Sequence, residues 1–164
     1  MNKKILSFYY LTIILLFFGS FYILGTDISI FYKKILIIGL CALKTLFFMI
    51  NVIKKEIDLF DKEINGDKEQ YSTILLSVFL IIISYSLDYF LLYSIDINCF
   101  QPLLKEAGSI KLLWNSFYYS SMIFFWMGIA DLNVNCSTGQ FITWAESMVT
   151  FFILSYGTFK FLKH

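Results

Sequence analysis

The sequence predicts an all-α membrane protein with four transmembrane helices and a re-entrant segment between the third and the fourth. Three observations lead to this prediction. The 164 residues are 59% hydrophobic and only 15% charged, and their mean hydropathy is +0.73, which leaves too little polar surface for a soluble domain of this size. The apolar residues form long runs separated by charged segments. One of these runs stops too early to cross a bilayer.

The first predicted span is the apolar run 5–24. Met1-Asn-Lys-Lys precedes it, as in a signal peptide, but the run exceeds the roughly 7–15 residues of a signal core and no small-residue cleavage site closes it. We therefore interpret it as a transmembrane helix. A cleaved signal over residues 1–24 is the alternative.

The second predicted span, residues 35–53, contains Lys44, and the third, residues 72–95, contains Asp88. A lone charge at mid-bilayer costs at least about 2.5–3.5 kcal/mol, so each needs a partner. We expect Lys44 to pair with Asp88 or with Glu146. Residues 54–70 between these spans are strongly charged, which predicts either a short amphipathic helix on the membrane surface or a solvated loop.

The re-entrant segment begins near Leu112. A helix from Leu112 to Trp126 would be about 20 Å long, against a hydrocarbon core of about 30 Å, and it is followed by Met-Gly-Ile-Ala-Asp. Non-helical backbone at that depth is tolerated only where protein buries it or a water-filled cavity adjoins it. A segment that leaves the bilayer on the side where it entered therefore suggests a pore.

The fourth predicted span, residues 140–161, carries a polar stripe. Thr143, Glu146, Ser147 and Thr150 fall on one helical face. Such a stripe lines a cavity or contacts another helix. We expect these side chains either to line the pore or to brace it, and Glu146 in particular could brace the re-entrant helix from behind.

The lysines predict the orientation of the chain. With four spans and one re-entrant segment, both termini and residues 54–70 share a side, and a full fifth span would divide the lysines evenly instead. Eight lysines lie on the shared side (Lys3, Lys4, Lys54, Lys55, Lys62, Lys68, Lys160 and Lys163) and four on the other (Lys33, Lys34, Lys105 and Lys111). This predicts cytoplasmic termini in a cell (inner) membrane. Cys99 and Cys136 flank the re-entrant segment on the predicted outer side, either as a disulfide or as two free thiols.

The re-entrant segment resembles the pore segment of tetrameric potassium channels. Tyr118-Tyr119-Ser120 matches the aromatic-aromatic-Ser pattern of that family, and residues 125–131, Phe-Trp-Met-Gly-Ile-Ala-Asp, align without a gap with Thr-Thr-Val-Gly-Tyr-Gly-Asp. The resemblance covers about residues 72–161. It implies a pore domain over 71–164, with an outer helix 72–95, a pore helix 112–126, a filter 127–131 and an inner helix 140–161. Residues 1–70 then form two additional transmembrane helices and a charged cytoplasmic linker.

The filter departs from the family pattern at several positions. Gly128 keeps the first glycine, but Ala130 replaces the second, where a non-glycine residue at positive φ costs about 1–2 kcal/mol. Ile129 replaces the bracing tyrosine, and Trp126 stands where the family has a threonine. The candidate filter residues are Trp126, Met127, Gly128, Ile129, Ala130 and Asp131. They predict a cation-selective pore whose selectivity is weaker than, or different from, that of potassium channels.

Asp131 is the strongest single candidate for an ion-binding role. Four carboxylates at the outer mouth of a tetramer would concentrate cations, monovalent or divalent, and repel anions. The alternative is a solvated loop carboxylate, or one that braces the filter.

Enzymatic chemistry has little support in the sequence. The single histidine is the terminal His164, no His/Cys/carboxylate cluster has zinc spacing, and all 13 basic residues are lysines. We expect no enzyme activity, no cofactor and no nucleic-acid partner. The expected partners are the lipid bilayer and further copies of the chain. The rival function is a non-conducting membrane protein, such as an accessory, immunity or scaffold protein with a decayed filter.

Overall fold

The computed structural model describes residues 27–60, 68–101, 108–127 and 133–162, together with Gly19, Tyr22 and Gly25. The prediction of a mainly helical chain is confirmed. The order of elements is α2 (Ile30–Phe60), α3 (Lys68–Ile95), the 3₁₀ turn η1 (Ile97–Cys99), β1 (Phe100–Gln101), α4 (Ser109–Phe124), β2 (Asn133–Val134) and α5 (Ser137–Leu162). The two short strands are a feature that the sequence did not predict.

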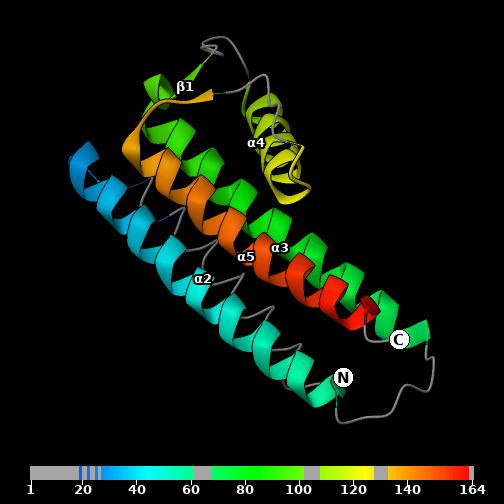
Figure 1. The fold of residues 1–164 in the computed structure, drawn as a ribbon. Coiled ribbons are helices and arrows are strands. Elements are labelled where there is room, and N and C mark those ends of the chain that lie inside the picture. Colours follow the sequence, from blue (N-terminus) through cyan, green and yellow to red (C-terminus); the bar gives the residue numbers. More distant parts are fainter. Residues whose placement is uncertain are drawn as a thin grey trace.

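Three long helices, α2, α3 and α5, run side by side, and the short helix α4 lies against only one half of their length (Figure 1). The long helices have 31, 28 and 26 residues, or about 46, 42 and 39 Å at 1.5 Å per residue. Helix α4 has 16 residues, or about 24 Å, which is less than the roughly 30 Å of a hydrocarbon core.

Helix α3 is the centre of the bundle. It contacts α2, α4 and α5, and most of its side chains from Ile81 to Tyr93 are buried. Within the described residues, the stretch Val78–Ile95 is the one that is long and apolar enough to cross a membrane. The predicted first span, 5–24, lies outside the described residues except for Gly19 and Tyr22.

The charged residues between the second and third predicted spans extend the long helices. Residues 54–60 continue α2, and residues 68–70 begin α3, while residues 61–67 lie outside the described part of the chain. The described part of this linker is thus neither a separate surface helix nor a loop.

Strands β1 and β2 bring together the two ends of the segment that contains α4. They pair antiparallel, Phe100 opposite Val134 and Gln101 opposite Asn133. Next to this pair, a disulfide joins Cys99 to Cys136 with a Cα–Cα distance of 4.8 Å, within the usual range for such bonds. Of the two states that the sequence left open for these cysteines, the structure has the disulfide. The chain between the strands therefore starts and finishes at the same end of the bundle (Figure 1).

Helix α4 ends in a Schellman motif. The amide of Met127 donates to the carbonyl of Met122 at 3.0 Å, and that of Trp126 donates to Ile123 at 3.1 Å. Trp126 holds the left-handed conformation at this motif, with φ 54°, a conformation that usually belongs to glycine and costs other residues about 1–2 kcal/mol. The helix ends here because the backbone of Trp126 is left-handed, although Trp126 is not a glycine.

Candidate pore segment

The buried carboxyl group of Glu146 connects α5 to both α3 and α4. Its Oε1 lies 2.6 Å from Ser120 Oγ of α4, and its Oε2 accepts a hydrogen bond from the hydroxyl of Tyr89 of α3 at 2.9 Å. Ser120 Oγ also donates to the backbone carbonyl of Ile82 at 2.9 Å. Because Glu146, Ser120 and Tyr89 are all fully buried, this network holds α4 against the two long helices.

Thr143 extends the same network by one helical turn. Its Oγ1 lies 3.2 Å from the Tyr89 hydroxyl and 3.4 Å from the Tyr119 hydroxyl, and it donates to the carbonyl of Gly139 at 3.0 Å. The rings of Tyr89 and Tyr119 meet edge to face at 4.8 Å. Both tyrosines thus present a hydroxyl to α5 and a ring to each other.

The remaining members of the predicted polar stripe lie close by. Thr150 is buried and donates to the carbonyl of Glu146 at 3.0 Å, and Ser147 is half-buried. Thr143, Glu146 and Thr150 turn toward the interior of the bundle. Their contacts are those of bracing residues within one chain.

A different face of α5 is exposed in the described part of the chain. Trp144, Met148 and Phe151 are exposed at intervals of three to four residues, so they form one apolar stripe along the helix. The ring of Trp126 stacks on Phe151 at 6.2 Å between centroids. The end of α4 is therefore continuous with this uncovered stripe.

Lys44 forms an ion pair with Asp88 between α2 and α3. Its ammonium group also donates to the carbonyl of Ser84 at 2.8 Å and lies 4.0 Å from the centre of the Tyr85 ring. The predicted pairing of Lys44 is confirmed, and of the two carboxylates considered, the partner is Asp88.

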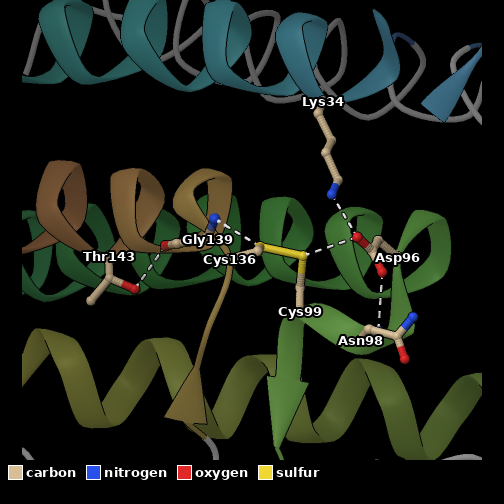
Figure 2. The surroundings of a disulfide bond; sticks show 7 residues. All are labelled: Lys34, Asp96, Asn98, Cys99, Cys136, Gly139 and Thr143. Carbon is tan, nitrogen blue, oxygen red and sulfur yellow. Dashed lines mark hydrogen bonds and ion pairs between the residues drawn. A yellow bond between two sulfur atoms is a disulfide. The ribbon is translucent and has the colours of Figure 1, made fainter. Parts of the chain in front are cut away.

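A second ion pair lies at the end of the bundle that carries the disulfide (Figure 2). Lys34 Nζ donates to Asp96 Oδ2 at 2.5 Å, and Asp96 Oδ1 accepts from the amide of Asn98 at 3.1 Å. The hydrogen bond from Lys34 is the main cause that lowers the pKa of Asp96 below its ordinary value of 3.8. Cys99 Sγ lies 3.5 Å from Asp96 Oδ2, so the ion pair ties α2 to the disulfide.

The sulfur of Cys136 lies at the start of α5. It accepts from the amide of Gly139 at 3.4 Å, as Figure 2 shows. A Cβ atom on Gly139 would lie 2.1 Å from Val134 Cγ1 and 3.2 Å from Leu92 Cδ2. Only glycine fits between β2 and α3 at this position.

Of the predicted filter residues, the structure describes Trp126 and Met127. Both are exposed at the end of α4. Residues 128–131, Gly-Ile-Ala-Asp, lie outside the described residues. The shape of the filter and the position of Asp131 therefore stay predictions from the sequence.

Tyr89 is the network residue that the sequence reasoning missed. It is one of 11 tyrosines, and a tyrosine in an apolar run has no local signal that distinguishes a hydrogen-bonding role from packing. Ser120 was noticed only as part of the aromatic-aromatic-Ser pattern. Its position in that pattern is the one signal that could have linked it to Glu146.

Within the described residues, no group of three or more His, Cys, Asp and Glu side chains could hold a metal ion. Comparisons of the chain with family models, with curated proteins and with solved structures find no match. The case for a function therefore rests on the residues and their geometry.

Proposed function

We propose that this chain is the subunit of a homotetrameric cation channel, in which α4 is the pore helix and residues 127–131 form the filter. The observation that carries the proposal is the path of the chain between β1 and β2. A helix too short to span a bilayer ends in a reversed turn, and the paired strands return the chain to the end of the bundle from which it left.

The distribution of polar and apolar side chains supports a membrane environment for the bundle. Leu43, Leu46 and other large apolar residues of α2 are exposed, whereas Lys44 and Glu146 are buried. A soluble protein buries its large apolar side chains and exposes its charges, and charged side chains within spans face the bundle interior in pairs. In the proposed arrangement, α2, α3 and α5 cross the bilayer, and residues 5–24 form the remaining span.

The end of α4 supports the presence of a pore. Trp126 and Met127 are non-helical and exposed in the single chain. They follow helix α4, which ends partway along the bundle (Figure 1). Exposed non-helical backbone at mid-membrane needs either a protein neighbour or water. Three further copies around a common axis would supply both. One re-entrant segment cannot enclose a pore alone, so the proposal requires oligomerisation, and a cross-linking series should stop at four subunits.

Ion selection follows from the chemistry of the filter loop. Backbone carbonyls that point at the axis would replace the water shell of a cation, and a ring of Asp131 carboxylates would attract cations to the mouth. The residues at 126, 129 and 130 differ from those of potassium channels, so we expect weaker or different discrimination between cations.

Single-channel recording tests this function. Purified protein in planar bilayers should give unitary cation currents, and Asp131→Asn should reduce their amplitude, because it removes the charge that concentrates cations. Asp96→Asn is the matched control. It makes the same chemical change at an aspartate that pairs with Lys34, outside the filter, and should leave the amplitude unchanged.

Silent bilayers from a protein that cross-links to a tetramer would overturn the proposal. They would support the rival function, a non-conducting membrane protein. If Asp131→Asn and Asp96→Asn reduce the current amplitude equally, Asp131 does not act in the conduction path.

A further inference from the structure

The carboxyl group of Glu146 lies among neutral hydroxyl groups. Its two oxygens contact Ser120 and Tyr89. The nearby lysine, Lys44, is engaged elsewhere, because it pairs with Asp88 and donates to the carbonyl of Ser84. The titratable side chains around Glu146 include Lys44 from α2, Tyr85, Asp88 and Tyr89 from α3, and Tyr119 from α4.

The hydrogen bonds of Ser120 need more protons than its hydroxyl group supplies. Ser120 Oγ lies 2.9 Å from the carbonyl oxygen of Ile82 and 2.6 Å from Glu146 Oε1. Both separations are hydrogen-bond lengths for two oxygen atoms, and each such contact needs a proton between the oxygens. A serine hydroxyl carries one proton, and a backbone carbonyl carries none. Of the two partners of Ser120, only the carboxyl group of Glu146 can carry a second proton.

The other contact of Glu146 then has a donor of its own. Tyr89 donates its single proton to Glu146 Oε2 at 2.9 Å, and Thr143 donates its own to the carbonyl of Gly139 at 3.0 Å. The 2.6 Å length suits a donor on either side, so the proton count and not the distance decides the direction.

We infer that Glu146 is a protonated, neutral carboxylic acid that donates to Ser120, while Ser120 donates to the carbonyl of Ile82. Burial favours the same state. An ionised carboxylate without a cationic partner is very unfavourable in a fully buried site, whereas a neutral acid with two hydrogen-bonded neighbours is not. The chain thus joins three helices at this point without placing a net charge among them.

Glu146 is then a positioning residue that acts through Ser120 on α4. This role rests on the proposed channel function, because it matters for conduction only if α4 is the pore helix. The protonation state itself does not rest on that function. Glutamine should replace Glu146 well, since its amide can donate to Ser120 and its carbonyl can accept from Tyr89.

Infrared spectroscopy of the full chain in lipid tests the protonation state. At pH 7 the wild type should show the carbonyl band of a protonated carboxylic acid, and this band should shift when glutamate is labelled with ¹³C in its side-chain carboxyl group. Glu146→Gln should abolish the band. Asp96→Asn, an equivalent change at an ionised carboxylate, should leave it in place.

The label makes the test independent of how the variants fold. If wild-type protein at pH 7 shows no acid band that responds to ¹³C-glutamate, or if Glu146→Gln removes intensity only from the carboxylate bands, the inference is overturned. Failure of the channel proposal would leave both results interpretable, because neither measurement uses ion flux.

The positioning role is tested separately by cation flux into vesicles. We expect Glu146→Gln to keep the wild-type flux and Glu146→Ala to lose most of it, because alanine can neither donate to Ser120 nor accept from Tyr89. A glutamine variant that is as impaired as the alanine variant would overturn the positioning role.

Discussion

Buried charges are the residues whose structural roles can be inferred most directly in this chain. Lys44 and Asp88 lie on neighbouring helices, and both are buried. Each interrupts an apolar run, so the cost of an unpaired charge predicts that each finds a partner. The same reasoning drew attention to Glu146, whose partners are hydroxyl groups instead of a cation.

Removal of one member of the Lys44–Asp88 pair should be strongly destabilising. Lys44→Met leaves the carboxylate of Asp88 buried without its partner, and such a loss costs about 3–5 kcal/mol. We expect the double variant Lys44→Met/Asp88→Leu to recover much of this loss. Chemical denaturation in detergent, followed by circular dichroism, measures the free energy of unfolding of each variant.

Lys34→Met is the matched control for this measurement. Its partner Asp96 is partly exposed, and exposed ion pairs contribute about 1 kcal/mol or less. Equal destabilisation by Lys34→Met and Lys44→Met would contradict the assignment of Lys44 to a buried pair.

The ion pair of Asp96 also predicts a dependence of stability on pH. Lys34 lowers the pKa of Asp96 in the folded protein below its ordinary value of 3.8. The pair therefore stabilises the fold fully above that ordinary value, and its contribution is lost as pH falls through the lowered pKa. Asp96→Asn should be slightly less stable than wild type at pH 7, by about 1 kcal/mol or less. The difference should disappear in strong acid, and thermal melting across the acid range measures it. A difference that grows toward low pH would contradict this account.

At the level of elements, the disulfide and the two strands join the two ends of the segment that contains α4. The sequence separation of Cys99 and Cys136 is 37 residues. A disulfide over that length lowers the conformational entropy of the unfolded chain, which stabilises the fold by about 4 kcal/mol. Cys99→Ser/Cys136→Ser should lower the free energy of unfolding by an amount of this order. Cys41→Ser, at the free cysteine buried in α2, is the control for serine substitution. Peptide mapping that finds Cys99 and Cys136 unlinked in the native protein would contradict the prediction.

A larger residue in place of Gly139 should cause a steric clash at the start of α5. Gly139→Ala would place a methyl group 2.1 Å from Val134 Cγ1, and such overpacking typically costs about 1–3 kcal/mol. Gly39→Ala in α2 is the matched control, because no atom lies within 4 Å of its added Cβ. Alanine there should be neutral or stabilising by up to about 1 kcal/mol. Denaturation of both variants in one detergent gives the comparison, and similar effects at the two glycines would contradict the packing at Gly139.

The sequence predicts some elements of this fold better than others, for physical reasons. Long apolar runs predict α3 and α5, because a run of that length has few alternatives to a helix. Strands β1 and β2 have two residues each, too few to show a two-residue period. The end of α4 has no glycine at its left-handed position, since Trp126 occupies it. Tertiary contacts such as the stacking on Phe151 are not visible in local sequence.

At the scale of the whole molecule, the candidate site depends on parts that the sequence could place only roughly. The polar stripe on α5 was predicted either to line a pore or to brace it. In the described part of the chain, Thr143 and Glu146 face α3 and α4, and the exposed face is the apolar stripe of Trp144, Met148 and Phe151. Helical periodicity shows which residues share a face, but it does not show which face meets its own subunit.

This orientation changes what we expect along the proposed channel. If α5 borders the conduction path below the filter, the path is lined mainly by apolar and aromatic side chains. A hydrophobic lining of this kind can gate a channel by dewetting. The four polar residues of the stripe would then influence conduction through the position of α4 and not by contact with ions.

The most direct test of the central claim is the accessibility of Met127 from water. With Cys41 replaced by serine, Met127→Cys should react with a membrane-impermeant, positively charged thiol reagent added on the side that carries the disulfide, and the modification should reduce the cation current. Leu46→Cys, on the exposed apolar face of α2, should react only with a lipid-soluble reagent. If Met127→Cys behaves like Leu46→Cys, the end of α4 faces lipid, and the re-entrant pore proposed here is wrong.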